Sequence, residues 1–207
     1  LGSGDFSGDG LPELVYGIQY SDLKKGSNIK LIVLTTIPGK GFSLFKPIMD
    51  IVPYTQAPRS SVIEDFNGDG VNDIFIADHG VDYKPYPGYQ NSLILSAPNG
   101  KFINATSSLP QILDFTHGVT SGDVDSDGDI DLFVTQNGIN VNVPHYFLRN
   151  NGKGRFTKVP DGQLLDRDFS YISSKPGNKR KNFYFTPGLE FVDDDDKLDL
   201  ILLSGKL

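Results

Sequence analysis

The chain has 207 residues, of which 38 % are hydrophobic and 22 % are charged. This length fits one domain or two small ones, and the composition can bury a core, which excludes an intrinsically disordered chain. The absence of cysteine excludes a disulfide scaffold, a thiol enzyme and any cysteine-based zinc or iron–sulfur site. A formal net charge of −7 argues against a dedicated nucleic-acid-binding protein, which needs a basic surface. No apolar stretch approaches the ~20 residues of a membrane-spanning helix, so we expect no span in this segment.

An acidic segment recurs four times along the chain. Its copies begin at residues 5, 65, 123 and 191, so successive copies are 60, 58 and 68 residues apart. The first three read DFSGDGLPE, DFNGDGVND and DVDSDGDID, and the fourth, FVDDDDKLD, is degenerate. A second marker, a glycine-containing turn followed by Phe42, Phe102 or Phe156, comes 37, 37 and 33 residues after the first three starts. Two independent markers at nearly fixed offsets define a repeat unit, with approximate boundaries 1–57, 58–115, 116–181 and 182–207.

Short apolar runs bounded by glycine, proline and asparagine are typical of strands rather than helices. They predict strands, in chain order, at residues 14–18, 29–34, 42–45, 61–63, 74–77, 92–95, 101–103, 118–120, 132–134, 146–148 and 200–203. Four strands per repeat of ~60 residues predict an all-β fold, a β-propeller with four-stranded blades, of which about three and a half are present. A β-sandwich of similar hairpins is the alternative, and the fixed spacing of the two markers counts against it.

The number of blades predicts a larger assembly, because a closed propeller needs at least ~4 blades. The chain opens on Leu1 without an initiator methionine, and we expect it to be a processed product or a piece of something longer. The remaining blades would come from the same longer chain or from other copies.

The acidic segments carry oxygen ligands at their first, third, fifth and ninth positions and, in the first three copies, a glycine at the sixth that lets the backbone reverse. The carbonyl of the seventh residue would supply a further oxygen. Clustered carboxylates repel one another unless a cation lies between them, and Ca²⁺, with its flexible coordination, suits such a loop better than Mg²⁺. The candidate metal ligands are Asp5, Ser7, Asp9, Leu11 and Glu13; Asp65, Asn67, Asp69, Val71 and Asp73; Asp123, Asp125, Asp127, Asp129 and Asp131; and Asp193, Asp195 and Asp199.

Two other interpretations of these segments fit the sequence less well. An EF-hand needs a glutamate at the twelfth position and flanking helices, but that position holds Tyr16, Ile76 and Val134, and the flanks predict strands. Simple hairpin turns would account for one aspartate and one glycine per copy, but not for the other ligands.

The four sites are expected to differ. The third has the most carboxylates and should bind most tightly, since affinity rises with ligand charge. The first has Glu13, longer than aspartate, and we expect this to alter its geometry. The fourth has Phe191 at its first position and Asp196 in place of glycine. Two or three calcium sites are therefore expected, and the fourth is doubtful.

The acidic motif, combined with the Asn-Gly-x-Gly-x-Phe segment that begins at Asn151, resembles the FG-GAP/VCBS repeat family over nearly the whole chain. Integrin-α-type members of that family form seven-bladed propellers with Ca²⁺ in such loops. The resemblance implies an extracellular, cell-surface or periplasmic module for adhesion, glycan binding or assembly.

A partner surface is expected at the end of the blades opposite the acidic loops. Tyr83, Tyr86 and Tyr89, stiffened by two prolines, would suit stacking on a sugar or capture of a peptide. Alternatively, these rings cover the gap between blades. We expect a non-catalytic module that recognises a glycan or extracellular protein, because no catalytic triad, HExxH or phosphate-binding loop is present. The alternatives are the propeller portion of a polysaccharide lyase or hydrolase and a structural subunit of a surface filament.

Overall fold

The computed structural model describes residues 2–18, 30–45, 48–49, 53, 55–81, 84–98, 100–136, 145–159, 183–192 and 198–205. Apart from one 3-10 turn, η1 (Thr106–Ser108), the regular elements of these residues are all β-strands. They are β1 (Gly2–Gly4), β2 (Glu13–Ile18), β3 (Lys30–Ile37), β4 (Gly41–Phe45), β5 (Ile48–Met49), β6 (Pro58–Glu64), β7 (Asp73–Asp78), β8 (Ser92–Ala97), β9 (Lys101–Asn104), β10 (Thr116–Gly122), β11 (Asp131–Gln136), β12 (Tyr146–Arg149), β13 (Thr157–Lys158), β14 (Phe183–Glu190) and β15 (Asp199–Gly205).

The strands form four sheets in sequence order. β1-β2-β3-β4 and β10-β11-β12-β13 are four-stranded antiparallel sheets, and β14 and β15 form a pair. The sheet between them holds β6, β7, β8 and β9 in antiparallel order, and β5 adds to its outer edge parallel to β9. Each predicted run lies on a strand, so the prediction of four-stranded units is confirmed. The described residues contain three such units and the first hairpin of a fourth.

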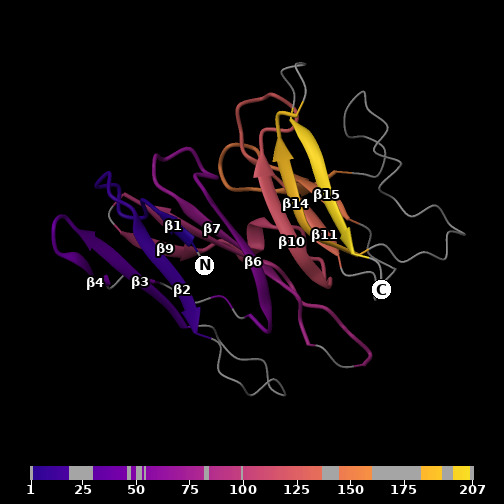
Figure 1. Cartoon of the computed structure of the whole chain (residues 1–207), viewed down its shortest axis with the longest axis horizontal. Coiled ribbons are helices and arrows are strands. Elements are labelled where there is room, and N and C mark those ends of the chain that lie inside the picture. Colours follow the sequence, from indigo (N-terminus) through magenta and orange to yellow (C-terminus); the bar gives the residue numbers. More distant parts are fainter. Residues whose placement is uncertain are drawn as a thin grey trace, which may run out of the picture.

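The first strands of the four units are neighbours. β6 contacts both β1 and β10, and β10 contacts β14, so the sheets follow one another with their first strands together and their later strands outside (Figure 1). This is the blade arrangement of a β-propeller, with each sheet as one blade. The expectation of an all-β fold with about three and a half blades is therefore confirmed.

The core lies between blades rather than within them. Successive side chains of a strand point to opposite faces of its sheet. On β7, Ile74 and Ile76 therefore pack towards the first blade, while Phe75 and Ala77 pack towards the third. All six residues of β7 are buried because both faces of this sheet are covered, and β11 is buried in the same way.

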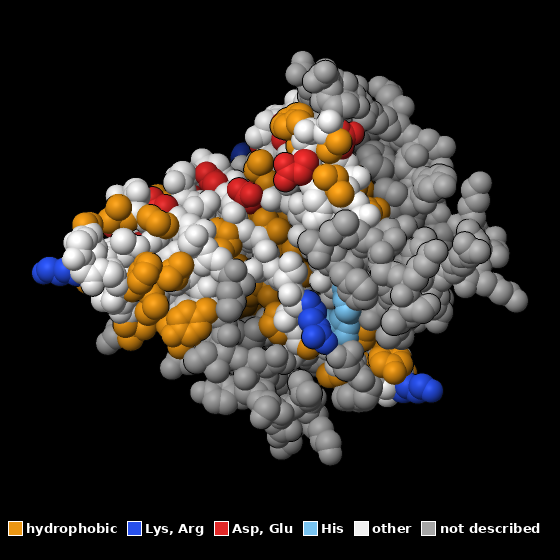
Figure 2. Space-filling view, viewed as in Figure 1, with side chains coloured by type: hydrophobic (Ala, Val, Ile, Leu, Met, Phe, Trp, Pro, Cys, Tyr) orange, Lys and Arg blue, Asp and Glu red, His pale blue; other side chains and the backbone are white. Residues whose placement is uncertain are grey.

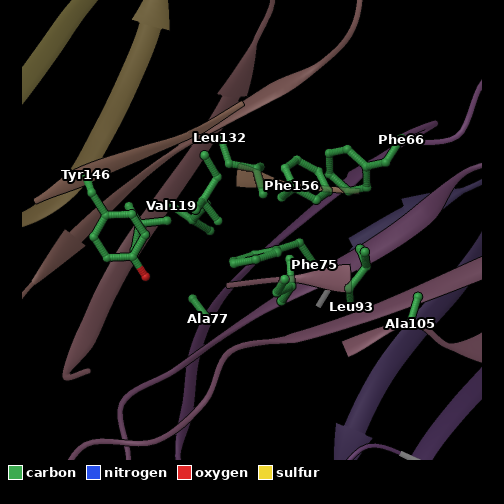
Figure 3. Close-up of a cluster of buried hydrophobic side chains, with 12 residues drawn as sticks. Phe66, Phe75, Ala77, Leu93, Ala105, Val119, Leu132, Tyr146 and Phe156 are labelled. Carbon is green, nitrogen blue, oxygen red and sulfur yellow. The ribbon is translucent and has the colours of Figure 1, made fainter. Parts of the chain in front are cut away.

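The junction between the second and third blades holds the largest of these clusters (Figure 3). Aromatic side chains from both blades meet in it, and Phe66 and Phe156 lie edge to face with ring centroids 5.5 Å apart. The buried members are Phe66, Phe75, Ala77, Leu93, Ala105, Leu109, Val119, Leu132, Val134, Tyr146, Leu148 and Phe156. A smaller cluster, between the third blade and β15, contains Phe133, Phe147 and Val159.

A buried group of polar side chains lies at the junction of the second and third blades, at the end of the strands opposite Phe66. Asp114, just before β10, accepts hydrogen bonds from Thr116 Oγ1 at 2.6 Å, from Gln136 Nε2 at 3.0 Å and from the Tyr146 hydroxyl. Tyr146 also accepts a bond from Asn91 Nδ2 in the second blade. Burial raises the pKa of Asp114 to about 6, because the charged carboxylate loses its water there.

One aromatic contact occurs at two junctions, between the first and second blades and between the second and third. Phe6 and Phe66, at the second position of their acidic loops, pack on Phe102 and Phe156 of the following blade, with ring centroids 5.9 and 5.5 Å apart. These four rings are at most 3 % exposed, whereas the equivalent Phe42 of the first blade is 54 % exposed. The phenylalanine marker therefore contributes to packing between blades.

Replacing Phe156 with alanine should lower the free energy of unfolding by about 3–5 kcal/mol, because it leaves a cavity in a closed junction. The matched control, Phe42→Ala, should cost less than about 1 kcal/mol, since this ring already meets solvent. Urea denaturation followed by circular dichroism measures both. Equal losses would contradict the assignment of the core to the spaces between blades.

Candidate metal centres

The acidic loops join the first and second strands of each blade. They occupy residues 5–12 between β1 and β2, 65–72 between β6 and β7, and 123–130 between β10 and β11. The fourth loop lies between β14 and β15, and its Asp193 and Asp195 are outside the described residues. Acidic side chains follow one edge of the molecule, the upper edge in Figure 2. The blade arrangement thus brings segments about 60 residues apart in sequence to a common edge.

The first aspartate folds each loop around itself. In the first loop, Asp5 Oδ1 accepts the backbone N–H groups of Gly8 at 2.7 Å and Asp9 at 3.2 Å, and Oδ2 accepts that of Gly10 at 2.8 Å. Asp65 accepts the equivalent three bonds in the second loop, and Asp123 accepts the last two in the third. The sixth-position glycines have φ of 81°, 88° and 91°, a backbone region that other residues rarely adopt.

The ninth-position carboxylate closes every loop, including the degenerate fourth. Glu13, Asp73, Asp131 and Asp199 each accept the N–H of the second residue of their loop, at 2.8, 2.9, 3.3 and 3.1 Å. The bond in the fourth loop forms although Phe191 replaces the first aspartate. This closure is a structural role of the acidic pattern that sequence reasoning missed.

Glu13 is accommodated in the first loop without loss of this closure. Its side chain is fully buried, and Oε2 accepts the N–H of Ser7 at 3.2 Å as well as that of Phe6. Its Oε1 accepts bonds from Ser7 Oγ at 3.1 Å and Thr35 Oγ1 at 3.5 Å. The extra methylene group thus lets one carboxylate bind more of the loop.

The fifth position also caps the backbone. Asp9, Asp69 and Asp127 accept the N–H two residues later, at 2.8, 3.1 and 3.0 Å. Local turn formation therefore explains more of the acidic pattern than one aspartate and one glycine per copy. Hydrogen bonding within the loops is compatible with metal binding, since each carboxylate oxygen has two lone pairs.

Two of the loops gather carboxylates more closely than turn formation requires. Asp5, Asp9 and Glu13, and likewise Asp123, Asp125 and Asp131, each offer one oxygen such that all three lie within 4.8 Å of one another. Charges this close repel unless a cation or protons neutralise them. The Oδ1 atom of Asp125 is buried and has no hydrogen-bond partner. A set of oxygen ligands with one unsatisfied buried oxygen fits a hard divalent cation such as Ca²⁺.

Burial perturbs the acidity of these carboxylates. It raises the pKa of Asp73 to about 7 and that of Asp131 to about 6, against the backbone hydrogen bonds that lower both. The pKa of Asp125 is also raised, first by desolvation and then by Asp127 and Asp123, while Arg149 lowers it. A bound cation would supply the compensating charge that the buried carboxylates lack.

Arg149 of β12 is a further participant that the sequence did not reveal. Its Nε lies 2.7 Å from Asp125 Oδ2, so one negative charge of the third loop is already paired. Counting carboxylates alone therefore overstates the charge available to a cation in the loop that was expected to bind most tightly.

The second loop has a weaker acidic cluster. Within the described part of the chain, only the first and third loops bring three carboxylates within 4.8 Å. In the second loop Asn67 occupies the third position, where its Oδ1 accepts the Asp69 N–H at 3.0 Å. The carbonyls of Leu11, Val71 and Asp129 stay predicted ligands. Of the three predicted ligands in the fourth loop, Asp199 is the one that lies in the described residues.

The predicted tyrosine surface is only partly described. Tyr83 is outside the described residues; Tyr86 is half-buried, and its ring meets Phe115 edge to face with centroids 5.8 Å apart. Tyr89 exchanges backbone hydrogen bonds with Asp114 across the junction of the second and third blades. His79 and His117, with ring centroids 4.4 Å apart, complete this aromatic group. These contacts agree with the alternative in which the rings cover the gap between blades.

In calcium-free buffer, the free energy of unfolding should fall by at least ~1 kcal/mol between pH 5 and pH 7. Asp73 has a pKa of about 7 in the folded protein and ~3.9 when unfolded, so in this window only the folded state keeps the proton. Raising the pH therefore favours unfolding, and the trend should level off above the folded pKa. Urea denaturation at several pH values measures the slope. Asp73→Asn should reduce the slope, whereas Asp9→Asn, at the equivalent exposed position of the first loop, should not, because Asp9 is not among the charges that shift the pKa of Asp73. A slope of opposite sign would contradict the assignment.

Residues 65–134 match a family model described as FG-GAP-like repeat. No curated protein matches the chain. The matched segment runs from the first aspartate of the second acidic loop into β11, beyond the third loop, so it contains two loops and the strands between them. These are the features that define the repeat in sequence and the blade in three dimensions. Residues 65–134 of this β-propeller chain are therefore an FG-GAP-like repeat.

Proposed function

We propose that this chain is a calcium-stabilised, non-catalytic propeller module that recognises a glycan or protein partner outside the cytoplasm. The observation that carries the calcium assignment is the close grouping of Asp123, Asp125 and Asp131 around a buried carboxylate oxygen without a partner. The first loop supplies a second such group.

Calcium would act on the junctions between blades. In the first two loops, the side chain of the second residue is buried against the next blade, and the first-position carboxylate beside it is partly exposed. In the first loop, a cation held by Asp5, Asp9 and Glu13, at the first, fifth and ninth positions, would fix the backbone that carries this aromatic ring. Binding to the folded state alone stabilises that state by mass action. In a chain without disulfides, such ions would be the cross-links of the fold.

The proposed location follows from the affinity expected of such loops. Extracellular calcium modules bind with dissociation constants of ~10⁻⁴–10⁻³ M, a range that external calcium fills and cytosolic calcium does not. The described residues include no helix that is long and apolar enough to cross a membrane.

The partner would bind at the end of the blades opposite the acidic loops. Tyr86 lies in the connection between β7 and β8 and is half-buried, with Lys84 and Pro85 exposed beside it. A tyrosine ring supported from below by Phe115 offers a firm surface on which a sugar ring can stack.

Adding calcium to the calcium-free protein should raise its melting temperature by roughly 5–10 °C at 100 times the dissociation constant. A single site then contributes about 2.7 kcal/mol, and 1 kcal/mol corresponds to about 2–4 °C for a chain of this size. Differential scanning calorimetry measures the shift. Magnesium at the same concentration should give a much smaller one, and Asp125→Asn should reduce the effect of calcium. Identical melting in chelator and in calcium would refute the proposal.

If Tyr86 forms part of a glycan site, Tyr86→Ala should lower affinity for the recognised glycan at least about tenfold. The variant loses both the stacking of the sugar on the aromatic ring and the contact area that the ring buries. Tyr86→Phe keeps the ring and should retain most of the binding. A glycan array followed by calorimetry on the best ligand provides the measurement. Unchanged affinity of the alanine variant would mean that Tyr86 only covers the gap between blades.

A further inference from the structure

The first and second acidic loops are joined directly by one residue, Asn72. The Oδ1 atom of Asn72 accepts the backbone N–H of Asp5 at 2.8 Å, and the backbone N–H of Asn72 donates to the carbonyl of Asp5 at 2.7 Å. Asp5 is the first aspartate of the first loop. Asn72 immediately precedes Asp73, the ninth-position carboxylate of the second loop. The two bonds thus connect a candidate ligand of one loop to the neighbour of a candidate ligand in the next.

A glycine makes room for this contact. A Cβ atom at Gly4 would lie 2.7 Å from Asn72 Oδ1 and 2.8 Å from Ile63 Cγ2, so a larger residue would displace the amide. The junction of the third and fourth blades has the same arrangement, where a Cβ at Gly122 would lie 2.7 Å from Leu198 Cδ1. Leu198 occupies the eighth position of its loop, as Asn72 does, but it cannot accept a hydrogen bond.

The next junction links its loops through different residues. The eighth position of the third loop is Ile130, which has no polar side-chain atom. Here Asn150 donates its backbone N–H to Asp131 Oδ1 at 2.7 Å and its side-chain Nδ2 to the carbonyl of Phe66 at 2.8 Å. Gly154 N–H donates to the same carbonyl at 2.8 Å. Adjacent loops are thus linked at both junctions, first to second blade and second to third. The Asn72 side chain accepts a hydrogen bond from the backbone, whereas the Asn150 side chain donates one.

We propose that Asn72 is a positioning residue that couples cation binding in the first loop to cation binding in the second. A cation in the second loop holds Asp73 and therefore the backbone of Asn72, and Asn72 in turn fixes both backbone groups of Asp5. The first loop then loses less conformational freedom when it binds its own cation. This inference rests on the proposed calcium function. Coupling between two sites must be reciprocal, so each loop should strengthen the other by the same factor.

Calcium titration of the ¹⁵N-labelled chain by NMR tests the coupling loop by loop. The amides of Gly10, Gly70 and Gly128 donate to the first aspartates of the three loops, so their resonances report each site separately. Asn72→Leu introduces the residue found at the equivalent position 198 and removes only the side-chain acceptor. The midpoint at Gly10 should rise about fivefold to tenfold, the equivalent of one lost hydrogen bond, while that at Gly128 stays unchanged. Asn72→Asp, which keeps an acceptor, should restore the Gly10 midpoint.

A double-mutant cycle separates coupling from simple support of the first loop. Asp65→Asn disables the second loop and should weaken binding at Gly10 at least threefold in the natural chain, but not further when Asn72 is leucine. The reciprocal change, Asp5→Asn, should weaken binding at Gly70 by the same factor. An unchanged Gly10 midpoint in Asn72→Leu, or equal shifts at Gly10 and Gly128, would overturn the proposal.

The same titration distinguishes the failure of this inference from the failure of the calcium function. If none of the three glycine resonances responds to calcium, the metal assignment itself is wrong. If Gly10 responds but Gly70 does not, calcium binds without the second loop, and the proposed coupling is refuted while the calcium function stands.

Discussion

The backbone N–H of the second residue of each acidic loop donates a hydrogen bond to the ninth-position carboxylate, and this bond ties the loop to the second strand of its blade. It occurs in all four blades, including the one whose first aspartate is replaced by Phe191. In the first two loops the second residue is Phe6 or Phe66, whose side chain packs in the core between blades. The ninth residue is the first residue of the second strand of its blade. One carboxylate therefore fixes the loop, the start of a strand and the position of a core side chain.

This geometry explains why a metal site would lie where it does. A buried carboxylate loses hydration, and the raised pKa values of Asp73 and Asp131 record that cost. The backbone N–H groups return part of the lost stabilisation, and a cation would return more. Loop folding and cation binding thus use the same side chains, so the acidic pattern serves a structural role even before any ion is considered.

The two ends of the blades solve different problems. At the loop end, the ninth-position carboxylates of the first three loops are buried and accept hydrogen bonds from backbone N–H groups, while their fifth-position carboxylates are exposed to water. At the other end, Asp114 is buried and accepts hydrogen bonds from Tyr146, Gln136 and Thr116 of the third blade. The bond from Asn91 to the Tyr146 hydroxyl joins this group to the second blade. Polar contacts at both ends and hydrophobic contacts between them hold each blade to the next. Stability is therefore expected to depend on neighbouring blades, as it does in other repeat architectures.

The repeat, the strands and the acidic loops can be predicted from the sequence, because these depend on local preferences: alternation of side chains, glycine at positive φ and aspartate that caps nearby N–H groups. Three contacts could not be predicted in this way: Phe156 with Phe66, Arg149 with Asp125, and Asn72 with Asp5. The first and third pairs join neighbouring blades, and the second joins a strand to a loop of the same blade. Asn72 carries no local signal, for an asparagine at the eighth position of an acidic loop has many ordinary explanations. The tertiary structure brings Asn72 to Asp5 because one blade packs on the next. This contact requires Gly4, which leaves room for the amide, and the register of β1 on β2, and no short window of sequence contains both.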